Sequence, residues 1–135
     1  PFGFTFNYTY ISGGDVDIDR YDTGRQFILP GLGDSGNFSV FFENDKHTAR
    51  IALNHRGETV AGFGNYDQPL FVEQRNQIDA SYQYKFAMGS ALTTLYLEVS
   101  NITDEPTRLY ARNSEMLFLS QDHGPIYKLG FRANF

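Results

Sequence analysis

Period-two alternation of apolar and polar residues recurs six times along the chain. In each segment every second residue is mostly apolar or aromatic, and the residues between are mostly polar or small. Because successive side chains of a strand point to opposite faces, this pattern predicts strands with one apolar and one polar face. The predicted strands cover residues 2–11, 37–43, 47–56, 76–86, 91–101 and 125–135.

Charged residues on these segments are confined to the polar face. No Asp, Glu, Lys or Arg occupies an apolar position in any of the six. Those on the other face are Glu43, Arg50, Arg56, Asp79, Lys85, Glu98, Lys128 and Arg132. Most segments match the ~9–11 residues with which a tilted strand crosses a bilayer. The pattern therefore favours an all-β fold, an antiparallel up-and-down transmembrane β-barrel.

The connections between the segments alternate in length. Residues 12–35, 57–74 and 104–123 are long and rich in Gly, Asp, Asn, Pro and Ser, whereas 44–46 and 87–90 are tight. Transmembrane barrels combine short periplasmic turns with long external loops. We therefore expect the tight turns and the C-terminal Phe135 to lie in the periplasm of a bacterium.

Alternation alone leaves open which face meets which surroundings. The aromatic face points inward in a soluble barrel and outward in a membrane barrel. Long connections at one end, aromatic residues near strand ends and charges on the opposite face favour the outward orientation. Two alternatives stay open, namely a soluble β-barrel module that binds an apolar ligand and a surface barrel that does not transport.

The composition narrows the class further. Aromatic residues make up 16% of the 135 residues, yet the mean hydropathy is −0.40. The absence of cysteine excludes disulfides and thiolate metal sites. A net charge of −5 gives no basic nucleic-acid footprint. Since the chain begins at Pro1 without a signal peptide, we expect residues 1–135 to be a fragment of an exported protein.

Catalytic signatures are weak. No serine stands in a Gly-x-Ser-x-Gly motif. Asp104 and Glu105 are adjacent, so their side chains diverge and do not flank a bond as paired catalytic carboxylates must. The stretches 31–33 and 62–64 are too short for a phosphate loop. We therefore expect no enzyme, no catalytic residue and no cofactor.

Metal signatures are equally weak. The acidic stretch 15–22 invites a calcium hypothesis, but an EF-hand loop needs Gly at position six and Glu at position twelve, where Arg20 and Gln26 stand. A looser calcium site and a solvated acidic loop are the two interpretations left. His47 and His55 would lie ~26 Å apart on one strand. No metal site is therefore predicted.

The last segment carries a family resemblance. Apolar residues occupy every second position up to a terminal phenylalanine, at Tyr127, Leu129, Phe131, Ala133 and Phe135. This arrangement resembles the C-terminal signature of outer-membrane barrels. The resemblance implies recognition by the barrel-assembly machinery, for which an unpaired amphipathic strand is a suitable template.

Further stretches resemble the C-terminal part of TonB-dependent receptors, with Ile102 where Leu is common; they are 29–32 followed by 37–43, then 77–84, 97–106 and 108–110. The resemblance implies the last six strands of a barrel of about 22 strands, in contact with outer-membrane lipid. It implies an importer of a small, scarce nutrient such as a siderophore, cobalamin or an oligosaccharide. The plug domain and the segment that contacts the TonB energy-transducing complex would lie in an absent N-terminal part.

The long connections hold candidate ligand contacts. Aromatic and hydrogen-bonding side chains suit sugars or siderophores. The candidates in two of the connections are Tyr66, Gln68, Phe71, Arg108, Tyr110, Arg112 and Asn113. The Asp-Glu-Pro form of the stretch 104–106 resembles receptors common in proteobacteria with many carbohydrate importers, and this resemblance implies a glycan among the possible nutrients.

Overall fold

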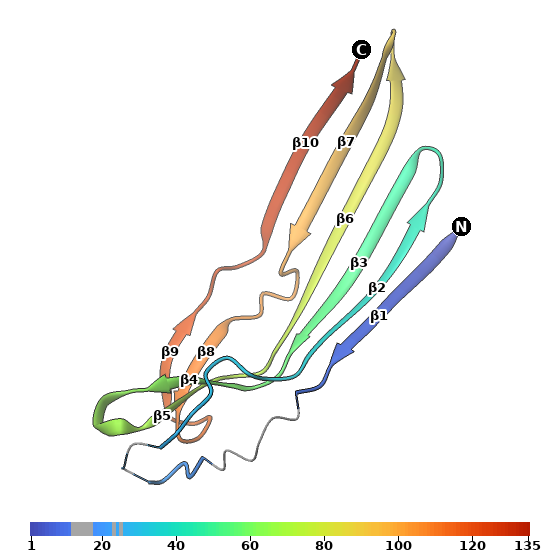
Figure 1. Cartoon of the computed structure of the whole chain (residues 1–135). Coiled ribbons are helices and arrows are strands. Elements are labelled where there is room, and N and C mark those ends of the chain that lie inside the picture. Colours follow the sequence, from blue (N-terminus) through green and yellow to red (C-terminus); the bar gives the residue numbers. More distant parts are fainter. Residues whose placement is uncertain (12–17, 23, 25) are drawn as a thin grey trace.

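A computed structural model of the chain describes residues 1–11, 18–22, 24 and 26–135 (Figure 1). Asp15 and Asp17, which belong to the calcium hypothesis, lie outside the described residues. The fold is all-β and antiparallel, in two sheets. The only helical piece in the described ranges is a 3-10 turn, η1 (Asn65–Asp67). No helix among these residues is long and apolar enough to span a membrane.

The larger sheet contains all six predicted strands. They pair antiparallel in chain order, so the up-and-down arrangement is confirmed. The observed boundaries agree with the predicted ones to within two residues. Between the third and fourth of these strands, and again between the fifth and sixth, the chain forms strands of a second sheet. The strands are β1 (Phe2–Thr9), β2 (Ser35–Glu43), β3 (His47–Arg56), β6 (Arg75–Met88), β7 (Ala91–Ser100) and β10 (Ile126–Asn134).

The two tight turns form as expected. Asn44 begins the turn between β2 and β3, and its Oδ1 accepts the backbone N–H groups of Lys46 and His47 at 2.9 and 2.7 Å. Gly89 in the turn between β6 and β7 has φ +64°, a conformation that favours glycine. In Figure 1 both turns lie at the end of the sheet that also carries the two chain termini.

Two of the three long connections are not plain loops, and this part of the expectation is wrong. Residues within 57–74 and 104–123 form a second sheet at the opposite end of the molecule (Figure 1), in the order β4-β5-β8-β9. Its strands have four or five residues and lack alternation, so a period-two search does not find them. They are β4 (Thr59–Phe63), β5 (Pro69–Val72), β8 (Thr107–Ala111) and β9 (Leu117–Gln121).

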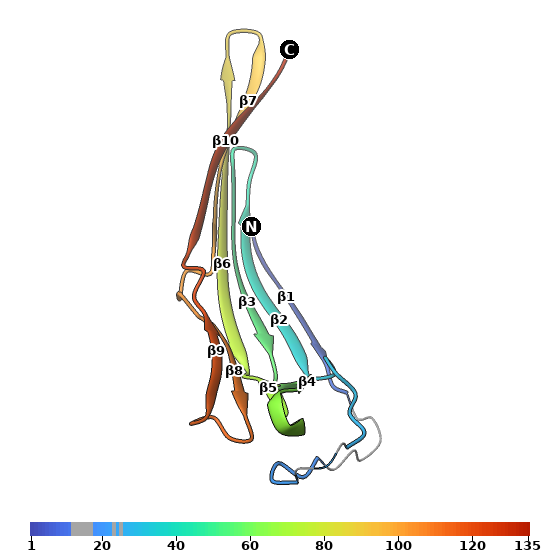
Figure 2. The same ribbon diagram turned by 90° about the vertical axis from the view of Figure 1, so that its left-hand side faces the viewer.

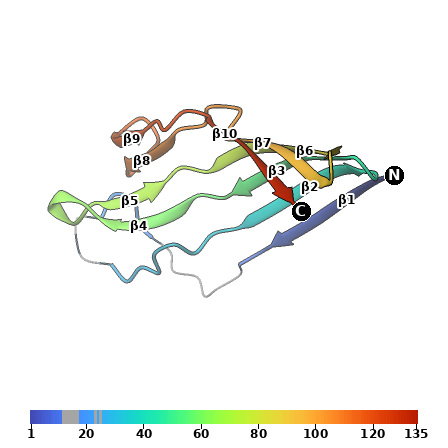
Figure 3. The same ribbon diagram turned by 90° about the horizontal axis from the view of Figure 1, so that it is seen from above.

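The larger sheet is open. β1 and β10 form its two edges, and they do not pair with each other. Figure 1 shows β1 and β10 at the two margins of the sheet, Figure 2 shows the long strands bending along their length, and Figure 3 shows the molecule from above. The chain alone therefore does not close a barrel.

Burial is concentrated in the second sheet. Leu70, Phe71, Tyr110 and Ala111 are among the few buried apolar residues, and all four lie on β5 or β8. In the larger sheet the apolar face is largely uncovered. The molecule thus has a small apolar core in the second sheet and a broad exposed apolar surface on the larger sheet.

Candidate functional site

The register of the larger sheet joins the apolar positions into continuous rows. Phe4 pairs with Val40, which pairs with Ile51. The row continues through Ala80 and Val99 to Tyr127. A neighbouring row runs in the same way through Phe2, Phe42, Ala49, Tyr82, Leu97 and Leu129. Because a one-residue slip would place polar residues on this face, the apolar pattern itself specifies the register.

Aromatic rings gather on the apolar face near the tight turns. The His47 ring stacks on Tyr84 with centroids 4.9 Å apart, and Tyr84 stacks on Phe86 at 5.6 Å. His47 Nδ1 also hydrogen-bonds the Tyr82 hydroxyl at 2.7 Å. Amphipathic rings at one level of a sheet are typical of the interfacial belt of membrane barrels.

The C-terminal signature residues lie on the edge strand β10. Tyr127, Leu129 and Phe131 face Val99, Leu97 and Leu95 of β7 in register, and Ala133 faces Thr93. Leu129 and Phe131 are both 73% exposed. Phe135 follows the end of β10 and is fully exposed. One side of β10 is therefore free to pair with another strand, and its apolar side chains are uncovered.

The polar face carries a chain of side-chain hydrogen bonds across strands. Asn37 Nδ2 donates to Asn54 Oδ1, and Asn54 Nδ2 donates to Asp79 Oδ2 at 2.8 Å. Asp79 Oδ1 accepts from Gln77 Nε2 at 2.7 Å and from the backbone N–H of Asn101 at 2.9 Å. A carboxylate only accepts hydrogen bonds, so Asp79 fixes the direction of donation along this series of hydrogen bonds.

Charge on this face is distributed unevenly. Lys128 Nζ lies 3.7 Å from Glu98 Oε2, with both side chains well exposed, so this pair contributes little to stability. Arg50, Lys85 and Arg132 have no ion pair or side-chain hydrogen bond within the described part of the chain. The half of the polar face toward the tight turns therefore carries these three cations beside Glu43, the last residue of β2.

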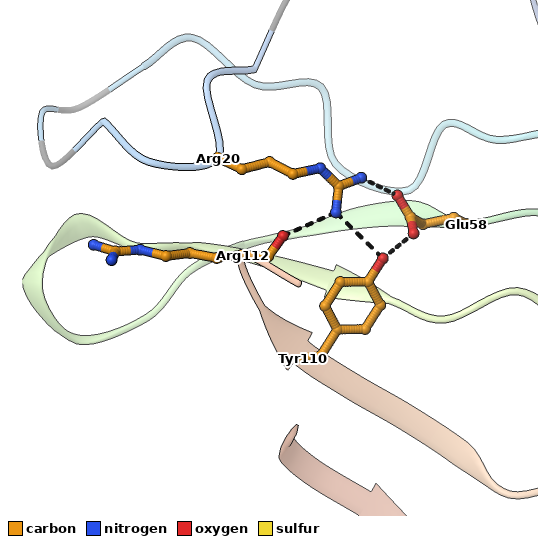
Figure 4. A network of polar contacts seen from close by, with 4 residues as sticks. All are labelled: Arg20, Glu58, Tyr110 and Arg112. Atoms are coloured by element: carbon orange, nitrogen blue, oxygen red, sulfur yellow. Dashed lines mark hydrogen bonds and ion pairs between the residues drawn. The ribbon is translucent and has the colours of Figure 1, made fainter. Parts of the chain in front are cut away.

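The second sheet is tied to the first long connection through Arg20 (Figure 4). Arg20 Nη2 donates to Glu58 Oε1 at 2.7 Å, and Nη1 donates to the carbonyl oxygen of Arg112 at 2.9 Å. The Tyr110 hydroxyl donates to the other Glu58 oxygen. The Arg20 guanidinium also lies over the Phe71 ring, 4.2 Å from its centroid. One arginine of the first long connection thus contacts the other two.

A glycine-containing strap, residues 30–34, reinforces this attachment. Gly31 has φ +79°, and its N–H donates to Val60 O at 2.9 Å. Gly57 N–H donates to Asp34 O at 2.7 Å. A Cβ on Gly33 would lie 2.9 Å from the Glu58 carbonyl oxygen, so only glycine fits there. The stretch 31–33 therefore serves close packing between two connections.

The structure brings together only some of the candidate ligand contacts. Phe71 and Tyr110 pair in register and stack with centroids 5.5 Å apart, and Arg112 follows Tyr110 closely. Both rings are only 4% exposed. A ligand would reach them only after the Arg20 contact had opened. Sequence reasoning missed Arg20, which lies in the first long connection, and Glu58, which lies in the same connection as Phe71.

The remaining candidates lie apart from that cluster. Tyr66 is 87% exposed at η1, with φ +60°, and Gln68 follows it in the same turn. Arg108 Nη1 forms an ion pair with Glu73 at 3.0 Å. Asn113 shapes the turn between β8 and β9, where its Oδ1 accepts the N–H of Glu115 at 3.2 Å. Of these four, Tyr66 is the most accessible to a ligand.

Asn101 is a buried residue that organises the connection after β7. It has φ +57°, and its Oδ1 accepts the N–H of Glu105 at 3.0 Å. Its Nδ2 donates to Glu105 O at 3.3 Å and to Gly124 O at 3.4 Å. Asparagine tolerates this left-handed conformation better than most residues. The Asn-Ile-Thr-Asp-Glu-Pro stretch is thus a structural turn that fixes the start and the end of the third connection.

Two carboxyl groups approach each other in that connection. Repulsion from Asp122, a weak desolvation and a hydrogen bond with Asp122 raise the pKa of Asp104 above its ordinary value. Gly124 N–H donates to Asp122 Oδ1 at 3.0 Å. Among the residues that the structure describes, no group of three or more His, Cys, Asp or Glu side chains is arranged to hold a metal ion.

Comparisons with known proteins give no match. No protein-family model, no curated protein and no solved structure is significantly similar to the chain.

Proposed function

We propose that the chain forms the last six strands of the barrel of a TonB-dependent receptor, a nutrient importer of the bacterial outer membrane. The observation that carries the proposal is the uncharged apolar face, which is continuous through all five pairings of the six-stranded sheet. Lipid tails are the surroundings that suit such a face. The strongly polar opposite face then lines the lumen.

The exposure of the apolar side chains supports this assignment. Phe2 is 82% exposed, Phe4 is 73% exposed and Ile51 is 61% exposed. A soluble monomer rarely leaves a contiguous apolar patch larger than a few hundred Å² in water. A soluble module would have to cover this face by closing the sheet around it, and the sheet is open.

The two free edges support a larger barrel. An unpaired edge strand is a liability unless another strand covers it. In the proposed barrel of about 22 strands, further strands continue from β1 and pair with β10. The exposed signature residues from Tyr127 to Phe135 on β10 then serve the barrel-assembly machinery before the barrel closes.

The two ends of the sheet suggest an orientation. The tight turns and both termini lie together, and the second sheet lies at the other end (Figure 1). With short turns in the periplasm, the second sheet faces the outside of the cell. Tyr66, at the tip of the β4–β5 connection, is then the outermost candidate for a first contact with a nutrient.

Transport itself rests on the family resemblance. A TonB complex would act through a plug upstream of these residues, and the nutrient would be a siderophore, cobalamin or, preferentially, a glycan. A barrel that does not transport is the alternative. Uptake of the nutrient that stops when the proton gradient is collapsed supports import, and unchanged uptake contradicts it.

The membrane assignment is tested by placing one charge on each face. Leu97 lies on the apolar face between Tyr82 and Leu129, and Gln83 lies on the polar face between Thr48 and Tyr96. We expect Leu97→Lys to destabilise the inserted barrel by up to about 2–4 kcal/mol, the cost of a lysine at the bilayer midplane, and to deplete the folded protein from outer-membrane fractions. Gln83→Lys is the matched control and should assemble normally. Equal assembly of both variants would contradict a lipid-facing apolar surface.

A further inference from the structure

Two arginines face each other directly on the polar side of the larger sheet. Arg56, the last residue of β3, pairs in register with Arg75, the first residue of β6. Cβ atoms of opposed residues lie only ~4.5–5.5 Å apart, and like charges in this position destabilise a sheet. A negative charge nearby would relieve the repulsion between the two guanidinium groups.

The protein supplies no carboxylate to this pair within the described part of the chain. Arg56 makes no ion pair or side-chain hydrogen bond there. Arg75 donates to the neutral oxygens of Thr107 and Gln77, at 3.1 and 2.7 Å. Each terminal nitrogen of a guanidinium carries two N–H groups, so Arg75 keeps further donors.

The neighbouring carboxylates are engaged elsewhere. Asp34 accepts the Tyr8 hydroxyl and the Ile11 N–H, at 3.0 and 3.1 Å. The other three bind positive or N–H groups of their own: Glu58 binds Arg20, Glu73 binds Arg108, and Asp79 binds Asn54, Gln77 and Asn101. The arginine pair is therefore a local positive site in a chain with a net charge of −5.

Both arginines line a cavity of about 550 Å³ on the polar face. No Asp or Glu is among its described lining residues. The next register row of the same face adds the amide side chains of Asn7, Asn37, Asn54 and Gln77. Amides both donate and accept, as hydroxyl groups require. The volume is in the range of small-molecule sites.

We propose that this cavity binds a small, hydroxyl-rich oxyanion, such as a sugar acid or a sugar phosphate. The Arg56 and Arg75 guanidinium groups would hold the carboxylate or phosphate, for which the arginine fork is well matched. The amide row would hydrogen-bond the hydroxyl groups. The inference rests on the proposed function in one respect only, since it places an import site on the lumen wall just below the second sheet.

A titration of the intact protein that carries this chain, purified in detergent, tests the proposal. The probes are glucuronate, glucose 6-phosphate and uncharged glucose, each followed by calorimetry. We expect at least one of the anionic sugars to bind at least about tenfold more tightly than glucose, and added salt to weaken its binding. The tighter anion identifies carboxylate or phosphate as the preferred group. Binding of glucose equal to both anions overturns the proposal.

Variants locate the binding. Arg56→Gln should weaken the binding of the anionic sugar about tenfold or more, because Arg56 has no other described partner to lose. Arg56→Lys keeps the charge without the fork and should give an intermediate loss. Arg132→Gln is the matched control, since it removes an arginine from the same face at the opposite end of the sheet. Equal losses from Arg56→Gln and Arg132→Gln, or no loss from Arg56→Gln, overturn the site.

Failure of this inference is distinguishable from failure of the proposed function. Binding in detergent needs neither transport nor a bilayer. A protein that passes the Leu97→Lys test and binds none of the three sugars contradicts the oxyanion site alone. A protein that binds glucuronate and tolerates Leu97→Lys contradicts the membrane assignment alone.

Discussion

The guanidinium of Arg20 donates to the carboxylate of Glu58 across 2.7 Å, and this contact links two connections 38 positions apart in the chain. Both side chains are 39% exposed, so the ion pair alone contributes at most about 1 kcal/mol. The ion pair matters mainly because the Arg20 guanidinium makes further contacts. The same guanidinium covers the Phe71 ring and donates to the Arg112 carbonyl, so that one side chain organises three connections.

Release of Arg20 should be visible as protease sensitivity. In Glu58→Gln the ion pair is lost, and the arginine side chain becomes free to enter a protease site. We expect trypsin to cleave after Arg20 several times faster than in the parent protein, as followed by mass spectrometry of the fragments. The matched control is Glu73→Gln, which breaks the other ion pair of the second sheet, at 3.0 Å to Arg108. Equal acceleration in both variants would show that Arg20 is not specifically held by Glu58.

A second prediction concerns Gly130, which pairs with Tyr96 on the polar face. The Tyr96 ring lies over the glycine, and a Cβ at position 130 would collide with it. Gly130→Ala should therefore displace the ring and cost about 1–3 kcal/mol in unfolding free energy, despite the higher strand propensity of alanine. Urea denaturation in detergent measures this. Asn134→Ala, an exposed substitution on the same strand, serves as the control, and a Gly130→Ala protein as stable as that control would contradict the packing argument.

Two substitutions of Asn101 distinguish the contribution of backbone strain to stability from that of the side-chain hydrogen bonds. Asn101→Gly loses the side-chain hydrogen bonds to Glu105 and Gly124, but glycine adopts the left-handed backbone conformation without strain. Asn101→Ala loses the same bonds and adds about 1 kcal/mol of strain, because alanine resists positive φ. We expect both to be less stable than the parent, with alanine the worse of the two. Should alanine equal glycine, the conformation of residue 101 must differ from φ +57°.

The sequence was sufficient for the six long strands because each repeats the period-two signal over seven or more positions, and one face is free of charge. It was insufficient for β5, where four consecutive residues from Pro69 to Val72 lack alternation and owe their pairing to tertiary contacts. The candidate site was also only partly predictable from the sequence. Phe71 and Tyr110 were identifiable as aromatic loop residues, whereas the hydrogen bond between Arg20 and Tyr110 spans 90 positions and has no local signature.

The pairing of Arg56 with Arg75 was hidden for a related reason. Both residues stand next to the connection 57–74, and only the register of β3 with β6 brings them face to face. Without knowledge of which strands are neighbours, each arginine is an ordinary charged residue on a polar face. Sequence reasoning therefore identified the polar face but could not identify the arginine pair on it.

The last prediction concerns pH and the third connection. Asp104 has a raised pKa in the folded protein, chiefly because the Asp122 carboxylate repels its negative charge. A carboxyl whose folded pKa is raised binds its proton more tightly in the folded state, so the folded connection loses stability as pH rises from the ordinary value of 3.8 through the raised one.

Asp122→Asn removes the repelling charge and keeps an oxygen for the Gly124 N–H. We expect the pKa of Asp104 to fall toward its ordinary value, as measured by NMR titration of its side-chain carboxyl carbon in detergent-solubilised protein. The stability of the connection should then cease to decline between the two pKa values, which hydrogen exchange of its backbone amides reports. A pKa of Asp104 that stays raised in Asp122→Asn would point to the smaller contribution, desolvation, as the main cause.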